Sequence, residues 1–465
     1  MRAPATDRGR LLLLGCLVAA VTLFTATVPL LRDWFDLRVY YGTVNTWIHH
    51  GGRVYDYRVP GTPYGFTYPP FAAVTMLPMA LVGLRTAIAV ALLLDLAALA
   101  VVLRVLAGPG WRRHGWYGAV LAACVLALFE PLRDTVSFGQ VNLLLLALVL
   151  ADARLLASGR GRWAGVGIGL AAAVKLTPAV FIGLLLVARR RRAAAVATAV
   201  AAAATAGAAL VAPEASRFYW TQALWDTGRV GRLGYVSNQS LQGVLARLGV
   251  DSKAVWAALV LVVLAVWARR ARRAGDAGDW QAAFALTGVT ACLISPVTWV
   301  HHLVWLLPSF AVLLRAGHAR VAGALYAVLC TSVVWLWFDD ASGVDGFLGS
   351  NTYTWVTLGL LLFLPAGQSR AERRPTSHSA SATTDPPSTA APAIAAACDQ
   401  PGRPAATATG TAAACAADRA TGSAAGSATG PAAALGRARS ASSDPTGSTR
   451  PPAANPQSSS SRASS

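Results

Sequence analysis

The sequence predicts an all-helical protein that crosses a membrane many times. Of its 465 residues, 55% are hydrophobic and only 13% are charged, and the mean hydropathy is +0.49. An ordinary soluble domain carries about 25% charged residues, and here the apolar residues come in runs, which indicates lipid as the solvent. These observations exclude a cytosolic enzyme, a secreted disulfide scaffold and a nucleic-acid-binding module.

The charge balance supports the same fold class. The net charge of +19 arises from 40 Lys and Arg against 21 Asp and Glu. We interpret this excess as the arginine of cytoplasmic loops, which fixes the orientation of a multi-spanning protein, and not as a nucleic-acid-binding face. The six cysteines show no CxxC or Cys/His spacing, so the sequence predicts neither a metal site nor a disulfide framework.

The N-terminal part predicts an anchor helix followed by a folded loop. The apolar run 11–31 follows a basic cytoplasmic stretch, 1–10, and favours a retained signal-anchor helix. The next segment, 32–70, carries three aspartates, six tyrosines and two tryptophans. It is too polar to span and too aromatic for a linker. We therefore expect it to fold as a first outer loop, with its rings at the membrane interface.

Further apolar runs predict about 12 transmembrane helices in all, given that a span needs about 20 residues. One of them is interrupted by Lys175 and Pro178, and we expect either one tilted helix or two half-helices there. The runs lie at 71–84, 86–106, 116–132, 141–157, 163–188, 193–212, 254–268, 280–297, 300–315, 319–338 and 352–365.

Arginine clusters predict which loops face the cytoplasm. The clusters at 189–192 and 269–273 mark cytoplasmic loops, so the large loop 213–253 and the segment 339–351 are expected outside. The orientation between 70 and 140 stays open, because the arginines there favour the cytoplasm whereas the span count does not.

The chain changes composition at its C-terminal end. The segment 366–465 contains no Trp, Phe, Tyr or Lys and only one Leu. It cannot bury a core, so we expect a disordered cytoplasmic tail. The transmembrane domain is accordingly expected to comprise residues 11–365.

One acid lies at the predicted membrane boundary. Asp36 follows the first span by about five residues, where a carboxylate can be held partly desolvated. Desolvation makes a carboxylate a better proton acceptor near neutral pH. The alternative is a solvated loop acid that pairs with Arg38.

Two basic groups interrupt the apolar runs. Lys175 is one of only two lysines, and lysine binds phosphate as a point charge. Pro178 breaks its helix and exposes backbone groups that must line a cavity, although a lysine that reaches a lipid head group is the alternative. The adjacent His301 and His302 favour an anion-binding site when one imidazole is protonated, whereas a joint metal site is not expected.

Other polar motifs lie at span ends. Amide-bearing side chains at 137–142 and 237–240 could bind a sugar or cap a helix, and the prolines at 65–71 could form a rigid helix entry. Polar groups gathered at span ends indicate a catalytic cleft at the membrane surface. A transporter would place polar residues near mid-span, and Lys175 fits either reading.

The motifs occur in a recognisable order and resemble glycosyltransferase family 87. This family comprises actinobacterial polyprenyl-phosphate-mannose-dependent alpha-(1,2)-mannosyltransferases of the GT-C fold class, and the resemblance covers roughly residues 10–365. The motifs that carry it are Asp36–Tyr41, Gly65–Phe71, Gly139–Asn142, Lys175–Pro178, Ser237–Ser240 and Ser295–His302.

The resemblance implies a GT-C-type bundle that transfers mannose from a polyprenyl-phosphate donor to a lipid- or wall-linked glycan acceptor. Transfer would occur with inversion on the outer face of the plasma membrane. Asp36 would be the general base, with Asp33 as the fallback, and no cofactor or metal is expected. The phosphate would be bound by Lys175, His301, His302 and Arg38, and the sugars by Tyr40, Tyr68, Gln140, Asn142, Asn238, Gln239 and Trp299.

Two alternatives remain at this point. Within the family, an arabinofuranosyltransferase that uses a polyprenyl-phosphate donor would carry the same motifs. From another class, a multi-spanning lipid or sugar transporter would share the composition.

Overall fold

The computed structural model describes residues 6–27, 33–108 and 110–367. In this part of the chain the regular secondary structure is helical, apart from one isolated bridge between Arg58 and Gly65. Its α-helices are α1 (Asp7–Thr27), α2 (Phe35–His49), α3 (Pro70–Thr75), α4 (Leu84–Ala107), α5 (Gly110–Leu128), α6 (Glu130–Phe138), α7 (Asn142–Ala157), α8 (Val166–Val174), α9 (Val180–Val187), α10 (Arg191–Val211), α11 (Pro213–Thr221), α12 (Leu241–Arg247), α13 (Lys253–Asp276), α14 (Trp280–Ile294), α15 (Leu307–Arg315), α16 (Ala319–Cys330), α17 (Gly343–Ser350) and α18 (Thr352–Phe363). Short 3-10 helices lie between them: η1 (Leu77–Leu81), η2 (Thr177–Ala179), η3 (Ala223–Trp225), η4 (Thr227–Arg229), η5 (Val300–Leu306) and η6 (Val333–Trp337).

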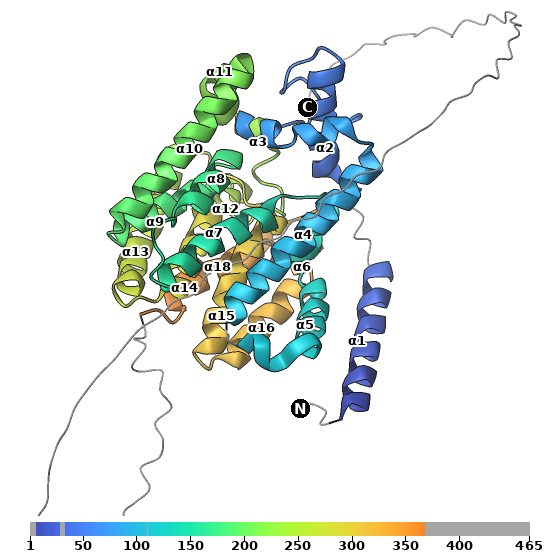
Figure 1. The fold of residues 1–465 in the computed structure, drawn as a ribbon, viewed down its shortest axis with the longest axis vertical. Coiled ribbons are helices and arrows are strands. Elements are labelled where there is room, and N and C mark those ends of the chain that lie inside the picture. The colour runs from blue at the N-terminus through green and yellow to red at the C-terminus, as the bar shows by residue number, and fades with distance from the viewer. Residues whose placement is uncertain (1–5, 28–32, 109, 368–465) are drawn as a thin grey trace, which may run out of the picture. The chain divides into compact units, whose positions relative to one another are not determined.

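The helices confirm the predicted class, an all-helical membrane protein (Figure 1). Among the described residues, α4, α10 and α13 are long and apolar enough to cross a membrane, and the bent pair α5–α6 makes a fourth if it forms one span. Other apolar runs appear as shorter helices of 10–17 residues. The count of about 12 spans stays a prediction.

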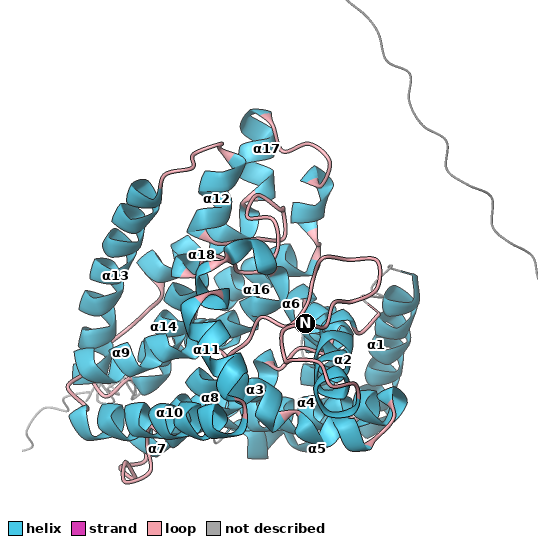
Figure 2. Ribbon diagram, turned by 90° about the horizontal axis from the view of Figure 1, so that it is seen from above, coloured by secondary structure: helices cyan, strands magenta, loops and turns pink. Residues whose placement is uncertain are grey.

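Glycine residues allow helices α8 and α10 to pack closely. Helices α8 and α10 lie side by side in both views (Figure 1, Figure 2). A Cβ built on Gly169 would lie 2.5 Å from the backbone oxygen of Ala197, and one on Gly165 would lie 2.2 Å from that of Ala193. Glycine therefore permits the two helix backbones to approach closely, as membrane helices commonly do.

The interrupted run around Lys175 forms two half-helices. Helix α8 ends at Val174, and Lys175 adopts an extended backbone with φ −144° and ψ 131°. Pro178 then lies in η2, where its missing N–H costs no helical hydrogen bond, and α9 begins at Val180. The break points a charged side chain away from the helix axes and toward neighbouring segments.

The segment after the first helix is folded, as predicted. Helix α2 packs a small apolar core together with the following loop, α3 and α11; its buried members include Leu37, Val44, Phe66 and Tyr219. The side of the membrane on which this core lies stays a prediction. The expected anchor run 11–31 corresponds to α1, although its last residues, 28–31, lie outside the described residues.

A second, larger core surrounds α14. Thirteen of the fifteen residues of α14 are buried, and α7, α9, α13, α15 and α18 pack around it. The loop 213–253 contains α11, η3, η4 and α12. The tail that was expected to be disordered, 366–465, lies outside the described residues except for its first two positions.

Candidate active site

A cavity of about 690 Å³ lies where the two cores meet. Segments from widely separated parts of the sequence line it: α2, the loop before α3, the α6–α7 turn, the α8–α9 break, the loop after α11 and the start of η5. Eight of the residues selected from the sequence line this one cavity: Asp36, Tyr40, Tyr68, Gln140, Lys175, Trp299, His301 and His302.

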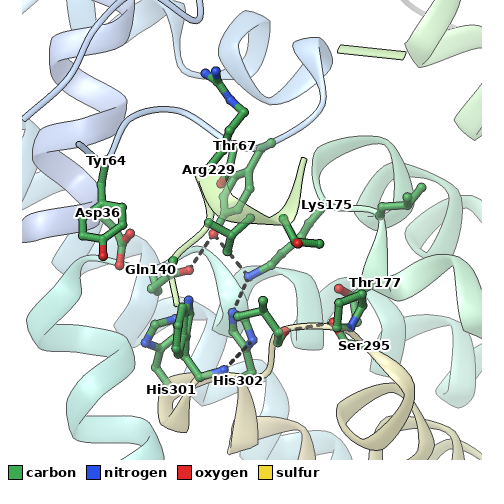
Figure 3. A pocket seen from close by; sticks show the side chains of 18 of the residues that line it. Asp36, Tyr64, Thr67, Gln140, Lys175, Thr177, Arg229, Ser295, His301 and His302 are labelled. Carbon is green, nitrogen blue, oxygen red and sulfur yellow. Dashed lines mark hydrogen bonds between the residues drawn. The ribbon is translucent and has the colours of Figure 1, made fainter. Parts of the chain in front are cut away.

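Asp36 lies in the first turn of α2 and faces this cavity (Figure 3). The helix begins after Trp34, whose left-handed backbone (φ 53°) turns the chain and whose N–H donates to the carbonyl of Ser137 at 3.1 Å. Burial raises the pKa of Asp36 to about 6, against the opposing effects of a hydrogen bond with Gln140 and the charge of Lys175. The carboxylate is therefore poised to accept a proton near neutral pH.

Gly139 fixes the distance between Asp36 and Gln140. It ends α6 in the left-handed region with φ 69°, as glycine commonly does after a helix. A Cβ on Gly139 would lie 2.6 Å from the Cβ of Leu37. Only glycine thus allows the α6–α7 turn to pack directly against α2, and this contact brings the Gln140 amide to the carboxylate.

Lys175 is buried, with 9% of its surface exposed, and its ammonium group has three polar neighbours. Its Nζ lies 2.9 Å from Asn142 Oδ1, 3.2 Å from the Tyr68 hydroxyl and 2.9 Å from His302 Nε2. It also lies 4.9 Å from the centre of the Tyr68 ring, within range of a cation–π interaction. A phosphate in the cavity would therefore meet an ordered point charge.

Tyr68 connects Gln140, which contacts Asp36, to Lys175 across the cavity. Its hydroxyl donates to Gln140 Oε1 at 2.8 Å and accepts from the Tyr40 hydroxyl at 3.0 Å. Burial raises the pKa of Tyr68 well above its usual value, and the charge of Asp36 adds to this effect. Tyr68 consequently stays protonated and links Gln140, next to Asp36, to Lys175.

The two histidines lie in η5 and line the cavity. The backbone N–H of Trp299 lies 3.2 Å from His302 Nδ1, so the imidazole is held by its own helix start. The His301 ring packs against Phe138 with centroids 5.1 Å apart, and the two imidazoles meet edge-on at 4.6 Å. Both rings thus border the place where Lys175 would bind an anion (Figure 3).

Comparison with known proteins identifies the family. A family model described as glycosyltransferase family 87 matches residues 66–296. Over 351 residues, which are 72% of this chain and 80% of the relative, the sequence is 36% identical to a Mycobacterium tuberculosis protein named polyprenol-phosphate-mannose-dependent alpha-(1-2)-phosphatidylinositol pentamannoside mannosyltransferase. The chain belongs to glycosyltransferase family 87. The resemblance inferred from the ordered motifs is confirmed.

A second relative of this family 87 glycosyltransferase comes from Mycolicibacterium smegmatis. It is named polyprenol-phosphate-mannose-dependent alpha-(1-2)-phosphatidylinositol mannoside mannosyltransferase, and it is 33% identical over 322 residues, which are 62% of this chain and 68% of the relative. No solved structure matches the chain significantly.

Three of the selected amides do not line the cavity of the family 87 enzyme. Asn142, Asn238 and Gln239 are fully buried. Asn238 donates to the carbonyls of Leu233 and Pro296 and accepts from the Thr298 N–H, and Gln239 Oε1 accepts from the Thr354 N–H. The Asn238 amide thus stabilises the irregular chain before His301, the Gln239 amide connects its loop to the α17–α18 junction, and Asn142 orients Lys175. The structure therefore does not place them in contact with substrate.

Arg38 also lies apart from the predicted phosphate site. Its guanidinium donates to the carboxylate and the carbonyl of Asp33, at 2.9 and 2.7 Å, and 40% of its side chain is exposed. Neither residue of this pair lines the cavity. Among the described residues, no group of three His, Cys, Asp or Glu side chains is arranged to hold a metal ion.

Several cavity residues were not selected from the sequence. Tyr64, Thr67, Thr177, Arg229 and Ser295 line the cavity (Figure 3), as do Tyr235 and Trp335. Arg229 lies in the loop 213–253, which was expected on the outer side of the membrane. An arginine in such a polar loop gives no sequence signal that it lines a cavity. Ser295 was inside a selected motif, and its position next to the proline break was the signal available for it.

Proposed function

We propose that this family 87 glycosyltransferase transfers mannose from a polyprenyl-phosphate donor to a phosphatidylinositol mannoside acceptor, forming an alpha-(1-2) linkage. The names of the mycobacterial relatives support this choice of donor, acceptor and linkage. The observation that carries it is one cavity in which a carboxylate with a raised pKa lies near a buried lysine–histidine pair.

The chemistry is a single displacement. Asp36 takes the proton of the acceptor hydroxyl, the hydroxyl oxygen forms a bond to the anomeric carbon, and the bond from that carbon to the phosphate oxygen breaks. The electron pair stays on the departing polyprenyl phosphate. A beta-linked donor thereby gives an alpha-linked product, with no covalent intermediate.

Basic groups stabilise the leaving phosphate. Lys175, His301 and His302 border one part of the cavity. Negative charge that develops on the phosphate meets the Lys175 ammonium, whose position is preorganised by its contacts with Asn142, Tyr68 and His302. A buried ammonium is worth more in such a site than in water, because the local dielectric is low. A metal ion is not required for this step.

A second cavity of about 200 Å³ suits the start of the polyprenyl chain. It shares Tyr40 and Gln140 with the first cavity, and its other walls are the buried carboxyl of Asp95 and mostly aliphatic side chains: Leu37, Pro78, Met79, Val82, Val90, Leu94 and Leu144. Side chains of α4 beside it, such as Leu93 and Leu96, are more than 60% exposed, as expected where a helix faces lipid. An isoprenoid chain could therefore reach the reacting centre from the bilayer.

The proposal includes the setting of the enzyme. We place it as a GT-C-type bundle of about 12 spans in the plasma membrane, with the cavity on the extracytoplasmic face and the C-terminal tail in the cytoplasm. The arginines at 189–192 and 269–273 support this orientation.

The test is a reconstitution of the full chain in detergent or nanodiscs. Polyprenyl-phosphate-[14C]mannose and the corresponding arabinose donor are each supplied with a phosphatidylinositol mannoside. We expect transfer of mannose alone, removal of the label by an alpha-(1-2)-specific mannosidase, and loss of transfer in Asp36→Ala at unchanged expression. Arabinose transfer would make the chain an arabinofuranosyltransferase. Movement of a lipid or sugar across vesicles without transfer, unaffected by Asp36→Ala, would make it a transporter.

A further inference from the structure

An aromatic wall lines one part of the main cavity and is not used by the chemistry above. It consists of Tyr235, Trp299 and Trp335, which come from the loop after η4, the start of η5 and the helix η6. The ring of Tyr235 meets both tryptophans edge-on, with centroids 6.0 Å away in each case. Three segments distant in sequence thus converge to present aromatic surface to a ligand.

A hydrogen bond to Glu130 anchors the indole of Trp335. Its Nε1–H donates to Glu130 Oε1 at 2.7 Å. Glu130 is 1% exposed, and its other carboxylate oxygen accepts a hydrogen bond from the hydroxyl of Tyr353. Because the polar edge of the indole is tied to Glu130, the ring borders the cavity with hydrocarbon surface. A carboxylate that holds two aromatic donors also fixes the ring orientation.

Trp299 is similarly confined. Gly231 has φ 143°, and a Cβ built on it would lie 2.9 Å from the indole of Trp299. A side chain at this position would displace the ring. The loop that carries Tyr235 therefore packs closely against Trp299, and the two parts of the aromatic wall are positioned together.

The chemistry of the wall fits a glycan better than a lipid. One face of a hexose carries C–H groups, which are attracted to the electron-rich face of an aromatic ring, while its hydroxyls need polar partners at the edges. Ser237, Ser295, Arg229 and Arg232 line the same cavity and supply such partners. The aliphatic surface that suits an isoprenoid lies instead in the second cavity.

The extent of the wall points to the acceptor. The donor brings one sugar, and that sugar must lie between Asp36 and the phosphate-binding Lys175. Three rings contributed by three segments exceed what this one sugar can cover. An acceptor with several sugars has further rings to place, and the cavity offers the aromatic wall for them.

We propose that Tyr235, Trp299 and Trp335 form the binding subsite for the acceptor glycan, and that Glu130 is a positioning residue that holds Trp335. This subsite rests on the proposed mannosyl transfer for its role in catalysis, whereas its affinity for a mannoside can be measured without the donor. The ligand class is a short chain of linked hexoses, such as a trimannoside.

The test compares two acceptors with the full chain in nanodiscs: octyl alpha-mannoside and an octyl trimannoside. In Trp335→Ala we expect the KM for the trimannoside to rise about tenfold, the effect of losing one stacking contact, with the KM for the donor within about twofold. Trp335→Phe keeps a ring and should show a smaller rise. Leu336→Ala is the matched control, because this neighbouring side chain is 78% exposed and does not line the cavity.

The positioning role of Glu130 is tested by comparing the KM for the trimannoside with the KM for the donor. Glu130→Leu should raise the trimannoside KM without changing the donor KM, and Glu130→Gln, which keeps an oxygen acceptor, should restore it. A parallel rise of both KM values would show a merely structural role and overturn the assignment of Glu130.

Binding of the trimannoside to the donor-free protein, measured by calorimetry, separates the two proposals. If the wild type binds the trimannoside and Trp335→Ala binds it about tenfold more weakly, the subsite stands even when no mannose is transferred. If Trp335→Ala does not fold, Trp335→Phe and Trp299→Phe decide the matter. Unchanged trimannoside binding and KM in the folded tryptophan variants would overturn the subsite.

Discussion

Lys175 Nζ lies 2.9 Å from His302 Nε2, although the two residues are 127 positions apart in the chain. The break between α8 and α9 supplies one of them and the start of η5 supplies the other. Both segments depart from regular α-helix, so the side chains at these points can turn into a cavity. Irregular backbone at membrane depth is tolerated where it lines such a cavity.

Removal of the Lys175 charge should abolish most of the transfer. We expect Lys175→Met to lower kcat about 10²- to 10³-fold, as loss of a preorganised electrostatic contact to a developing charge does. The other lysine supplies a matched control: Lys253 is exposed at the start of α13 and lies outside the cavity lining. Kinetics of mannose transfer check this. Equal losses in Lys175→Met and Lys253→Met would contradict a phosphate-binding role.

Loss of the general base should be as severe. Asp36→Asn keeps the size of the side chain and removes the proton acceptor, so we expect transfer to fall about 10²- to 10⁴-fold. Asp33→Asn is the control, because the Asp33 side chain is 75% exposed and pairs with Arg38 outside the cavity. A larger loss in Asp33→Asn than in Asp36→Asn would move the base to the earlier aspartate.

The raised pKa of Asp36 predicts the acid limb of the pH profile. With a pKa of about 6, the carboxyl is protonated at lower pH and cannot accept the proton of the acceptor. We expect kcat/KM to fall about tenfold per pH unit below 6 and to level off above about 7. Initial rates across pH 4.5 to 8 measure it, and a profile that stays flat down to pH 5 would exclude Asp36 as the titrating base.

The same shift has a consequence for stability. The folded pKa of Asp36 lies above its ordinary value of 3.8, so ionisation costs the folded state stability as the pH rises from about 4 to about 6. Asp36→Asn removes this cost. Its Tm should exceed that of the wild type at pH 8 and match it at pH 4, and the opposite order would place the carboxylate in a stabilising environment.

Gly139 should tolerate no side chain. Gly139→Ala adds strain at φ 69° and a Cβ 2.6 Å from the Cβ of Leu37, so we expect a loss of about 2 kcal/mol or more in the free energy of unfolding and a lower rate through displacement of Gln140. Gly159→Ala is a matched control with φ 72° and no atom within 4 Å of the added Cβ. Thermal unfolding and transfer assays compare the two. Similar effects at both positions would show that only the backbone conformation matters.

Transfer should not depend on a divalent metal. In the proposed mechanism basic side chains meet the leaving phosphate, so we expect the initial rate to be unchanged after treatment with EDTA. Loss of activity that Mg²⁺ or Mn²⁺ restores would show that a metal ion takes part in the displacement.

The sequence predicted which segments meet at the site, because a charge or a proline within an apolar run is costly unless it lines a cavity. Lys175 and the two histidines beside Pro296 were found in this way, whereas Asp36 was selected as an acid at the membrane boundary just past the first predicted span. The sequence could not predict where an amide points. The Asn238 amide bonds to backbone groups of Pro296 and Thr298, and the Gln239 amide bonds to those of Ser350 and Thr354. Such bonds depend on tertiary packing.

The helical class was likewise predictable from composition, whereas the division of apolar runs into helices was not. The run 300–315 carries no visible interruption yet begins with the 3-10 helix η5, and for the interrupted run 163–188 the sequence left one tilted helix or two half-helices open, of which the structure has the half-helices. Of the aromatic wall, only Trp299 was selected from the sequence, and Tyr235 and Trp335 were missed for a related reason. An exposed tyrosine and a tryptophan in η6 carry no local signal, and only the packing of Trp335 on Glu130 reveals what they form.

Tyr40 and Gln140 border both cavities, so a partition one side chain thick separates the aliphatic compartment from the reacting centre. Tyr40 bonds to Tyr68, and Gln140 contacts the carboxylate of Asp36. A chain that fills the aliphatic compartment therefore presses on the residues that orient the base. Lipid carriers of different length or saturation would then alter the turnover of the enzyme as well as its affinity for the donor, because the partition transmits the fit of the carrier to the residues around the base.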